Sequence, residues 1–213
     1  MATINDVKTA LVLAPHTDDG ELGCGATISK LIREQVAVWY VAFSKCEESL
    51  PIGCPKDTLV NELRLATEKL GISQERVSVL DYKVRHFSES RQKILDDLIK
   101  LGGEIKPDVV FIPSPHDIHQ DHATIASEGM RAFKKTSIFA YELPWNNYSF
   151  FNQAFVRVSE EDVHNKILAL QQYKSQNNRQ YVKPDSILAI LRTHGMQVGS
   201  DYAEVFEVPR IVV

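Results

Sequence analysis

Residues 10–43 read ALVLAPHTDDGELGCGATISKLIREQVAVWYVAF, and this stretch decides the fold. The run ALVLA over 10–14 is continuously apolar, as expected of a parallel strand that is buried on both faces. A turn rich in glycine follows, then a helical pattern over 26–35 and a second apolar run over 37–43. A strand, a helix and a second strand in this order predict a βαβ unit with two parallel strands.

The rest of the chain continues this alternation. Further apolar runs predict strands over 77–80, 108–112, 138–141, 155–158 and 204–208. The patterns with helical spacing predict helices over 58–70, 91–101, 122–134, 160–175 and 186–193. Gly71 and the pair Gly102-Gly103 are expected to end the first and second of these helices. We therefore expect an α/β fold with a mostly parallel sheet, in a single domain that spans 1–213.

The composition excludes several classes of protein. A length of 213 residues suits one domain. With 44% hydrophobic and 24% charged residues, the chain is an ordinary globular protein and neither disordered nor fibrous. The net charge is -4, and no basic stripe is present, so we expect no nucleic-acid partner.

The cysteines and the apolar runs bear on the compartment. Cys24, Cys46 and Cys54 are odd in number and lack paired spacing, which argues against a disulfide framework. The first residues lack the basic and apolar regions of a signal peptide. No apolar run approaches the roughly 18 residues of a membrane span. The sequence therefore predicts a cytoplasmic protein with no transmembrane segment.

A first cluster of polar residues directly follows the strand at 10–14. His16, Asp18, Asp19 and Glu21 lie within six residues. Imidazole and carboxylate together form a ligand set for zinc or iron. Because Asp18 and Asp19 are adjacent, their side chains diverge, so one can bind a metal while the other faces a water beside it.

Two other interpretations of this loop remain open. The aspartates could simply cap the following helix in a solvated turn. Gly23-Cys24-Gly25 could belong to a dinucleotide-binding loop, although Ile28 occupies the third glycine position and the carboxylates would repel a pyrophosphate.

A second cluster, His116-Asp117-Ile118-His119-Gln120-Asp121-His122, follows the strand at 108–112. It holds three of the seven histidines. Because ligands bind at the carboxyl ends of parallel strands, both clusters are expected at one edge of the sheet. Together they complete a three-ligand open site of the kind that catalytic zinc prefers. His119 and His122 flank Asp121 and are favoured as functional residues. Whether His116 is functional or structural is left open.

The three remaining histidines stand apart from both clusters. We expect them to be ordinary hydrogen-bonded residues. They are His86, His164 and His194.

Taken together, the two clusters resemble the motifs of the LmbE-like, or PIG-L, family of zinc-dependent N-deacetylases. The first family motif, His-Pro-Asp-Asp-Glu followed by Gly-x-Gly-Gly-Thr, is similar to residues 16–27 here. The second, Asp-x-His-x-Asp-His, matches residues 117–122. Weaker matches extend the resemblance over almost the whole chain; they include Glu62, Lys174-Ser175-Gln176 and the ending Tyr202-Ala203-Glu204-Val205-Phe206.

The resemblance implies a Rossmann-like three-layer fold and a function. It implies zinc held by His16, Asp19 and His122, with Asp18 as the general base on the water that the zinc holds. His119 would sit over the scissile amide as a hydrogen-bond or proton donor, and Asp121 would hydrogen-bond His119 and keep it protonated. The implied substrate is a small-molecule conjugate of an N-acetylglucosamine-type sugar, from which acetate is released. Fe²⁺ suits the same ligand set.

The departures from the family motifs concern the substrate. Thr17 and Gly20 replace the usual Pro and Glu, and neither position is a ligand. Leu59 stands where sugar-binding members often carry Arg. The residues that bind substrate are therefore unknown; Arg64, Arg85 and 145–147 are candidates. The aromatic loop 145–151 fits either a pocket lid or a subunit contact in a homo-oligomer.

Two functions from other classes compete with the deacetylase. Two histidines and one carboxylate also suit a non-haem iron oxygenase, although such enzymes are usually β-barrels. A non-catalytic module that binds a metal or a nucleotide is supported only by the glycine pair.

Overall fold

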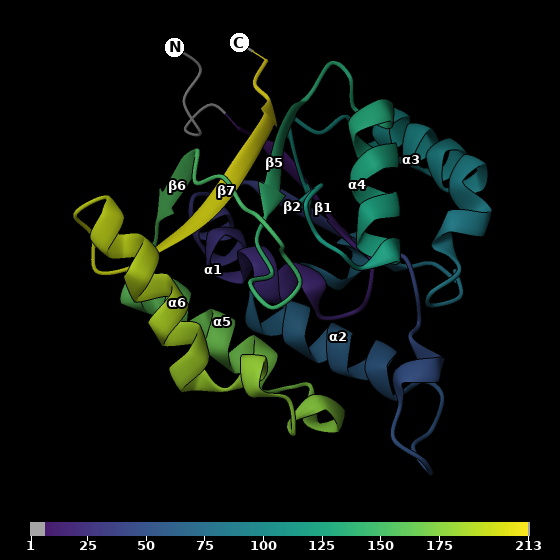
Figure 1. Ribbon diagram of the computed structural model, residues 1–213, viewed down its shortest axis with the longest axis horizontal. Helices are drawn as coiled ribbons and strands as arrows, with labels where there is room; N and C mark the ends of the chain where they lie inside the picture. Colours follow the sequence, from purple (N-terminus) through teal and green to yellow (C-terminus); the bar gives the residue numbers. More distant parts are fainter. Residues whose placement is uncertain (1–6, 213) are drawn as a thin grey trace.

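The computed structural model describes residues 7–212 and consists of one sheet between two layers of helices (Figure 1). The sheet has seven strands, in the order β3-β2-β1-β4-β5-β7-β6. Their bounds are Thr9–Ala14 (β1), Ala37–Ala42 (β2), Val77–Val79 (β3), Val109–Pro113 (β4), Ser137–Tyr141 (β5), Ala154–Arg157 (β6) and Ala203–Arg210 (β7).

The sheet confirms the mostly parallel prediction. Each neighbouring pair from β3 to β5 is parallel, and β7 is antiparallel to both β5 and β6. β1 pairs with β2 on one side and with β4 on the other, so the strand order reverses between β1 and β4. The loops after these two strands therefore open at the same edge, where doubly wound folds bind ligands.

The helices cover both faces of the sheet. α3 and α4 lie on one side, and α1, α2, α5 and α6 lie on the other (Figure 1). Their bounds are Asp19–Arg33 (α1), Thr58–Lys69 (α2), Arg91–Ile105 (α3), Gln120–Ala132 (α4), Glu160–Leu170 (α5) and Pro184–Gln197 (α6). Within residues 7–212, no helix has the length and apolar character needed to cross a bilayer.

Side chains of β1 alternate between the two cores, because successive residues of a strand point to opposite faces. Val12 belongs to the core under α1, α2 and α5, and Leu11 and Leu13 belong to the core under α3 and α4. The five residues 10–14 are fully buried. This explains why the strand is continuously apolar and not alternating.

Helix α1 is kinked at Cys24, where φ is -142° and ψ is 24°. The kink frees backbone groups on both sides, and a buried ion pair satisfies them. The Glu204 carboxylate accepts a hydrogen bond from the N–H of Ala26 at 3.1 Å. Lys166 Nζ bonds Glu204 at 2.6 Å and donates to the carbonyl of Leu22 at 2.7 Å. The helix can therefore turn just after the polar loop without leaving buried backbone groups unpaired.

Several helix boundaries differ from prediction, and α6 extends to Gln197, four residues beyond the expected end. α1 begins at Asp19 and not at 26, because Asp19 and Gly20 are already helical. α3 continues through Gly102 and Gly103 and ends before Lys106, which takes the left-handed conformation with φ 51°. A Cβ at Gly102 would lie 3.0 Å from the Phe133 ring, so this glycine permits close helix packing. α5 ends at Leu170, five residues earlier than expected.

Gly23→Ala is expected to lower the free energy of unfolding by about 3 kcal/mol, the upper range for an overpacked core. The added Cβ would lie 2.2 Å from the Tyr141 ring, and Tyr141 is held by its hydrogen bond to the carbonyl of Leu13 at 3.0 Å. Gly103→Ala is the control: its Cβ meets nothing within 4 Å, and alanine in a helix is favoured by up to about 1 kcal/mol. Urea denaturation measures both, and equal stabilities would contradict this packing.

Candidate metal-dependent active site

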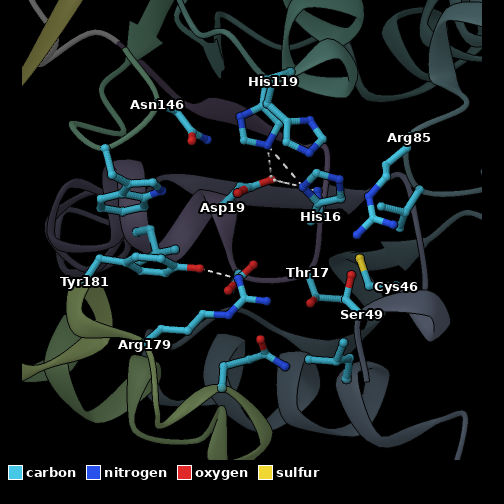
Figure 2. Close-up of a pocket in the computed structure, with 17 residues that line it drawn as sticks. His16, Thr17, Asp19, Cys46, Ser49, Arg85, His119, Asn146, Arg179 and Tyr181 are labelled. Atoms are coloured by element: carbon cyan, nitrogen blue, oxygen red, sulfur yellow. Dashed lines mark hydrogen bonds and ion pairs between the residues drawn. The ribbon is translucent and has the colours of Figure 1, made fainter. Parts of the chain in front are cut away.

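Three side chains from the two loops converge on one point at the edge of the sheet. His16 follows β1, Asp19 opens α1, and His122 lies in the first turn of α4. His16 Nδ1 lies 3.1 Å from Asp19 Oδ2 and 3.1 Å from His122 Nε2. His122 Nε2 lies 3.2 Å from Asp19 Oδ2. The three atoms thus form a nearly equilateral triangle, and Figure 2 shows two of its residues, His16 and Asp19, at the cavity.

Each histidine is oriented by a second carboxylate behind it. His16 Nε2 donates to Asp121 Oδ2 at 3.0 Å, and His122 Nδ1 donates to Asp117 Oδ2 at 2.7 Å. In the neutral rings these bonds place the protons on the outer nitrogens, which leaves His16 Nδ1 and His122 Nε2 with lone pairs facing the centre. Carboxylates that fix the tautomer of metal-binding histidines in this way are typical of metal sites.

The triangle suits a tetrahedral metal. Ligand atoms at about 2.0–2.1 Å from zinc are separated by about 3.3 Å in tetrahedral geometry, close to the separations observed. His119 also has a ring nitrogen within 4.8 Å of nitrogens of His16 and His122. We favour Asp19 as the third ligand because its Oδ2 lies closer to both histidines, and because His119 has another partner, described below.

The three side chains of the triangle shift one another's pKa. Burial opposes ionisation of Asp19, but the charges of His122 and His16 hold the pKa of its carboxyl well below the usual range. Burial also opposes protonation of His122, but the Asp19 charge and the hydrogen bond to Asp117 raise its pKa to about 10. The Asp19 charge and the hydrogen bonds to Asp121 and Asp19 likewise raise the pKa of His16 against its burial. A cation is therefore favoured here, whether protons or a metal supply it.

Zinc binding near pH 7.5 is expected to release at least one proton per ion. His122 is protonated below about pH 10 in the metal-free protein, and only its neutral form is a ligand. Zinc affinity should therefore rise with pH up to about 10. Titration calorimetry in buffers of different ionisation enthalpy counts the protons. Binding without proton release would show that the metal does not displace a proton from His122.

Asp18 lies beside the triangle and lines the same cavity. It occupies the N-cap position of α1, but its side chain makes no cap hydrogen bond, so the capping interpretation of this residue is wrong. Burial, and then the neighbouring charge of Asp19, raise the pKa of Asp18 to about 6. A carboxylate with this pKa is ionised at neutral pH and basic enough to accept a proton from a water.

The structure places His119 and Asp121 differently from the expected pair. His119 Nδ1 accepts a hydrogen bond from the backbone N–H of Asp121 at 3.2 Å, while the Asp121 carboxylate bonds His16 and the backbone N–H of Arg85. Asp121 thus holds the loop of His16 and not the ring of His119. Burial and the nearby charges of His122 and His16 lower the pKa of His119, so Asp121 does not keep it protonated.

The neutral His119 ring therefore carries its proton on Nε2. His119 lines the cavity, so this N–H is a hydrogen-bond donor for a bound molecule. This geometry agrees with the prediction that His119 acts as a donor in the site. It does not agree with the prediction that Asp121 supports His119.

The triangle and Asp18 open into a cavity of about 330 Å³, which is large enough for a small ligand. Its walls come from the segments 16–22, 46–59, 84–85, 119–122, 145–146 and 176–181. Trp145 stacks on Tyr181 with ring centroids 4.1 Å apart and an interplanar angle of 9°. Of the candidate substrate residues, Arg85, Trp145 and Asn146 line the cavity, whereas Arg64 bonds Gln74 on the surface.

Several residues of the site were not identified from the sequence. Asp117 orients His122, and Arg179 and Tyr181 close the side of the cavity opposite the histidines (Figure 2). Asp117 is the first residue of the second motif, so the motif could have indicated its role. Arg179 and Tyr181 lie in a polar segment without motif or periodicity, so the sequence carried no signal for them.

A buried network holds the first loop from below. Glu21 is fully buried and accepts hydrogen bonds from Tyr40 and, at 2.9 Å, from Tyr173. Both tyrosine hydroxyls also lie within hydrogen-bond distance of the Thr17 carbonyl, at 3.0 and 2.7 Å. A Cβ at Gly20 would lie 2.6 Å from the Tyr40 ring. Tight packing of this kind accounts for the glycine at this position.

The other histidines lie outside the cavity that holds the triangle. His116 donates to Glu207 at 2.8 Å, and His86 bonds Glu89 at 2.8 Å. His194 lies 3.3 Å from Glu142. His164 is exposed on α5.

Comparison with known proteins gives a family match. Residues 11–133, more than half of the chain and both motifs, match the family described as PIG-L, GlcNAc-PI de-N-acetylase. The chain is 29% identical over 184 residues to the uncharacterized deacetylase YaiS of Escherichia coli strain K12, covering 82% of this chain and 95% of that protein. It is 26% identical over 136 residues to a diacetylchitobiose deacetylase of Thermococcus kodakarensis, covering 60% of this chain and 50% of that protein.

Solved structures share the fold. The conserved protein TT1542 of Thermus thermophilus superposes with a TM-score of 0.77 at 27% identity, covering 96% of this chain and 95% of that one. The N,N'-diacetylchitobiose deacetylase of Pyrococcus horikoshii gives a TM-score of 0.77 at 21% identity, covering 95% of this chain and 84% of that one. The Rossmann-like fold implied by the motifs is thereby confirmed.

Proposed function

This chain belongs to the PIG-L family of deacetylases, and we propose that it is a zinc-dependent N-deacetylase. Its substrate would be a small-molecule conjugate of an N-acetylglucosamine-type sugar, and its products acetate and a free amine. The observation that carries the proposal is the triangle of His16 Nδ1, Asp19 Oδ2 and His122 Nε2 beside the free carboxylate of Asp18.

The triangle fits zinc in donor type, in the separation of its atoms and in the carboxylates behind both histidines. His16, Asp19 and His122 would hold the ion. When bound, zinc supplies Lewis-acid polarisation of the amide carbonyl and acidifies the attacking water. Fe²⁺ would fit the same donor set.

The side chains around the triangle would divide the proton transfers. Asp18, ionised at neutral pH, accepts a proton from the water while the water oxygen bonds to the carbonyl carbon. That proton is then delivered to the amine nitrogen, so that the C–N bond breaks with a neutral amine as leaving group. The His119 Nε2–H donates a hydrogen bond to the carbonyl oxygen, where negative charge develops.

The side chains that line the cavity support a sugar substrate. The stacked pair Trp145 and Tyr181 forms an aromatic wall, and Asn146 offers an amide to hydroxyl groups. The related deacetylases of Thermococcus kodakarensis and Pyrococcus horikoshii are named for diacetylchitobiose, an acetylated sugar. Neither the alternative oxygenase nor a non-catalytic module would need Asp18 beside the triangle.

Acetate release from a panel of N-acetylglucosamine conjugates by the zinc-loaded protein tests the proposal. We expect turnover of at least one conjugate, with acetate and amine formed in equal amounts. Oxygen consumption by the iron-loaded protein in the presence of an oxoacid, without acetate release from any conjugate, would instead favour the oxygenase.

A further inference from the structure

His116 belongs to the second polar cluster but lies outside the cavity that holds the triangle. Its Nδ1 lies 2.8 Å from Glu207 Oε1 and donates a hydrogen bond to that carboxylate. The ring also packs edge-on against the rings of Tyr148 and Phe151, at centroid distances of 5.7 and 5.4 Å. Both aromatic side chains are exposed and belong to the aromatic loop 145–151. His116 therefore connects a buried carboxylate of β7 to a loop at the surface.

The Glu207 carboxylate binds three segments of the chain at once. Its Oε2 accepts a hydrogen bond at 2.6 Å from Ser114, which directly follows β4. Its Oε1 accepts from His116 and, at 3.1 Å, from the backbone N–H of Phe151. A buried charge is costly unless it is hydrogen-bonded, and Glu207 is buried. Loss of the His116 donor would therefore leave Oε1 with one of its two partners.

Serine, histidine and a carboxylate also form catalytic triads, but their order here is different. In a triad the histidine is hydrogen-bonded to the serine hydroxyl. Here Ser114 donates to Glu207, and among residues 7–212 no hydrogen bond joins the His116 ring to that hydroxyl. The three residues therefore tie segments together and do not activate a nucleophile.

The aromatic loop has no buried side chain of its own. Each residue of 145–151 is exposed or half-buried, so burial in the core does not hold the loop. Two backbone bonds join it to the second cluster: Tyr148 N–H to the carbonyl of His116 at 3.3 Å, and Ile118 N–H to the carbonyl of Asn146 at 3.1 Å. Segments held by few buried contacts open easily. The bond from His116 to Glu207 anchors this contact in the interior, because the Glu207 side chain is only 5% exposed.

The position of the aromatic loop determines one wall of the cavity. Trp145 and Asn146 both line it, and Trp145 carries the stack on Tyr181. Figure 2 shows Asn146 on the side of His119. A displaced loop would therefore move the aromatic wall and the Asn146 amide away from a bound molecule.

The triangle does not depend on the same anchor. Asp117, which orients His122, accepts a hydrogen bond from the backbone N–H of His119 at 2.7 Å. The N–H of Asp117 donates to the carbonyl of Ser114 at 3.2 Å. These bonds hold Asp117 without the His116 ring, so a change at His116 should leave the metal ligands in place.

We propose that His116 is a positioning residue for substrate binding. Its hydrogen bond to Glu207 fixes the aromatic loop so that Trp145 and Asn146 face the bound sugar, and His116 itself touches no substrate. The inference rests on the proposed function for the sugar, but the position of the loop can be measured without turnover.

His116→Asn and His116→Leu test this as a matched pair. The two side chains have the same branched shape, and only asparagine has an amide N–H that can donate to Glu207. In the zinc-loaded protein, KM for the best conjugate of the panel should rise about tenfold or more in His116→Leu, as loss of a hydrogen bond to a charged group allows. His116→Asn should restore most of the original KM.

The split between KM and kcat separates positioning from a general loss of structure. Both kcat and zinc content should stay within about threefold of the unmutated protein in each variant, because the triangle and Asp18 are unchanged. His164→Leu, at an exposed site on α5, is the control and should leave KM unchanged.

Trp145 reports the position of the loop directly. The chain has two tryptophans, Trp39 and Trp145, so Trp39→Phe leaves Trp145 as the single fluorophore. In this background, acrylamide quenching should rise in His116→Leu toward its value in Tyr181→Ala, which lacks the stacking partner of Trp145. Quenching in His116→Asn should match that of the Trp39→Phe parent.

Four results would overturn the proposal. The first is unchanged KM and quenching in His116→Leu and in His116→Ala, a second variant without the donor. The second is a loss of kcat and zinc with KM unchanged. The third is equal impairment in the leucine and asparagine variants. The fourth is failure of both donor-free variants to fold in a thermal unfolding assay, which would assign His116 to stability alone.

The two readouts also separate this inference from the function. If quenching distinguishes leucine from asparagine at residue 116 but no conjugate releases acetate, the positioning of the loop stands and the deacetylase proposal fails. If acetate is released while KM and quenching are unchanged in the donor-free variants, the deacetylase stands and the role of His116 fails.

Discussion

Asp18→Asn is expected to lower kcat for acetate release by about 100- to 10,000-fold, the usual contribution of a general base. Asparagine has the same shape but cannot accept the proton of the attacking water. The variant should still bind one zinc per chain, because Asp18 is not part of the triangle of His16, Asp19 and His122. Acetate release and metal content, measured on the same preparation, check both parts.

The pH profile gives a second measure of the same role. Burial and the Asp19 charge raise the pKa of Asp18 to about 6 in the absence of metal, and a nearby cation lowers it again. The base is active only when ionised, so kcat should fall as the pH drops through a value no higher than about 6. Asp201→Asn, at an exposed carboxylate, should leave rate and profile unchanged. Full activity in Asp18→Asn would assign the base to another residue.

His122→Ala is expected to abolish zinc binding at micromolar metal and to reduce acetate release to background. The substitution removes one of three donors, and the Asp19 and Asp117 carboxylates that now bond His122 lose a common partner. Metal analysis by mass spectrometry, on protein purified without a metal-affinity tag, measures the loss.

The exposed His164 on α5 provides the matched control, and His164→Ala should retain one zinc per chain. Thermal unfolding of both variants separates loss of metal from loss of fold. If folded His122→Ala kept a full equivalent of zinc with the affinity of the unmutated protein, the triangle would not be the metal site.

The order of strands and helices was predictable because the central strands β1, β2 and β4 are continuous apolar runs. β1 is the clearest case, since residues 10–14 are fully buried. The helix boundaries were less predictable, because tertiary packing overrides local signals. Gly102 and Gly103 look like a helix stop, yet α3 continues through them because Phe133 packs where a side chain at Gly102 would be.

The site was predictable as far as its residues lie in compact motifs after strands. His16, Asp19 and His122 meet as the resemblance implied, since β1 and β4 are neighbours and their loops share an edge. Pairings within the site were not predictable. Asp121 lies two residues from His119 in sequence but bonds His16, 105 residues away, because the start of α4 directs its carboxylate toward the first loop.

Zinc titration of the metal-depleted protein, followed by acetate release from the best conjugate of the panel, tests whether the triangle holds the catalytic metal. We expect no hydrolysis without metal, a linear rise in rate with added zinc and a break at one zinc per chain. The titration should have no effect on His122→Ala. Hydrolysis at the full rate by protein shown to be free of metal would contradict a metal-dependent mechanism.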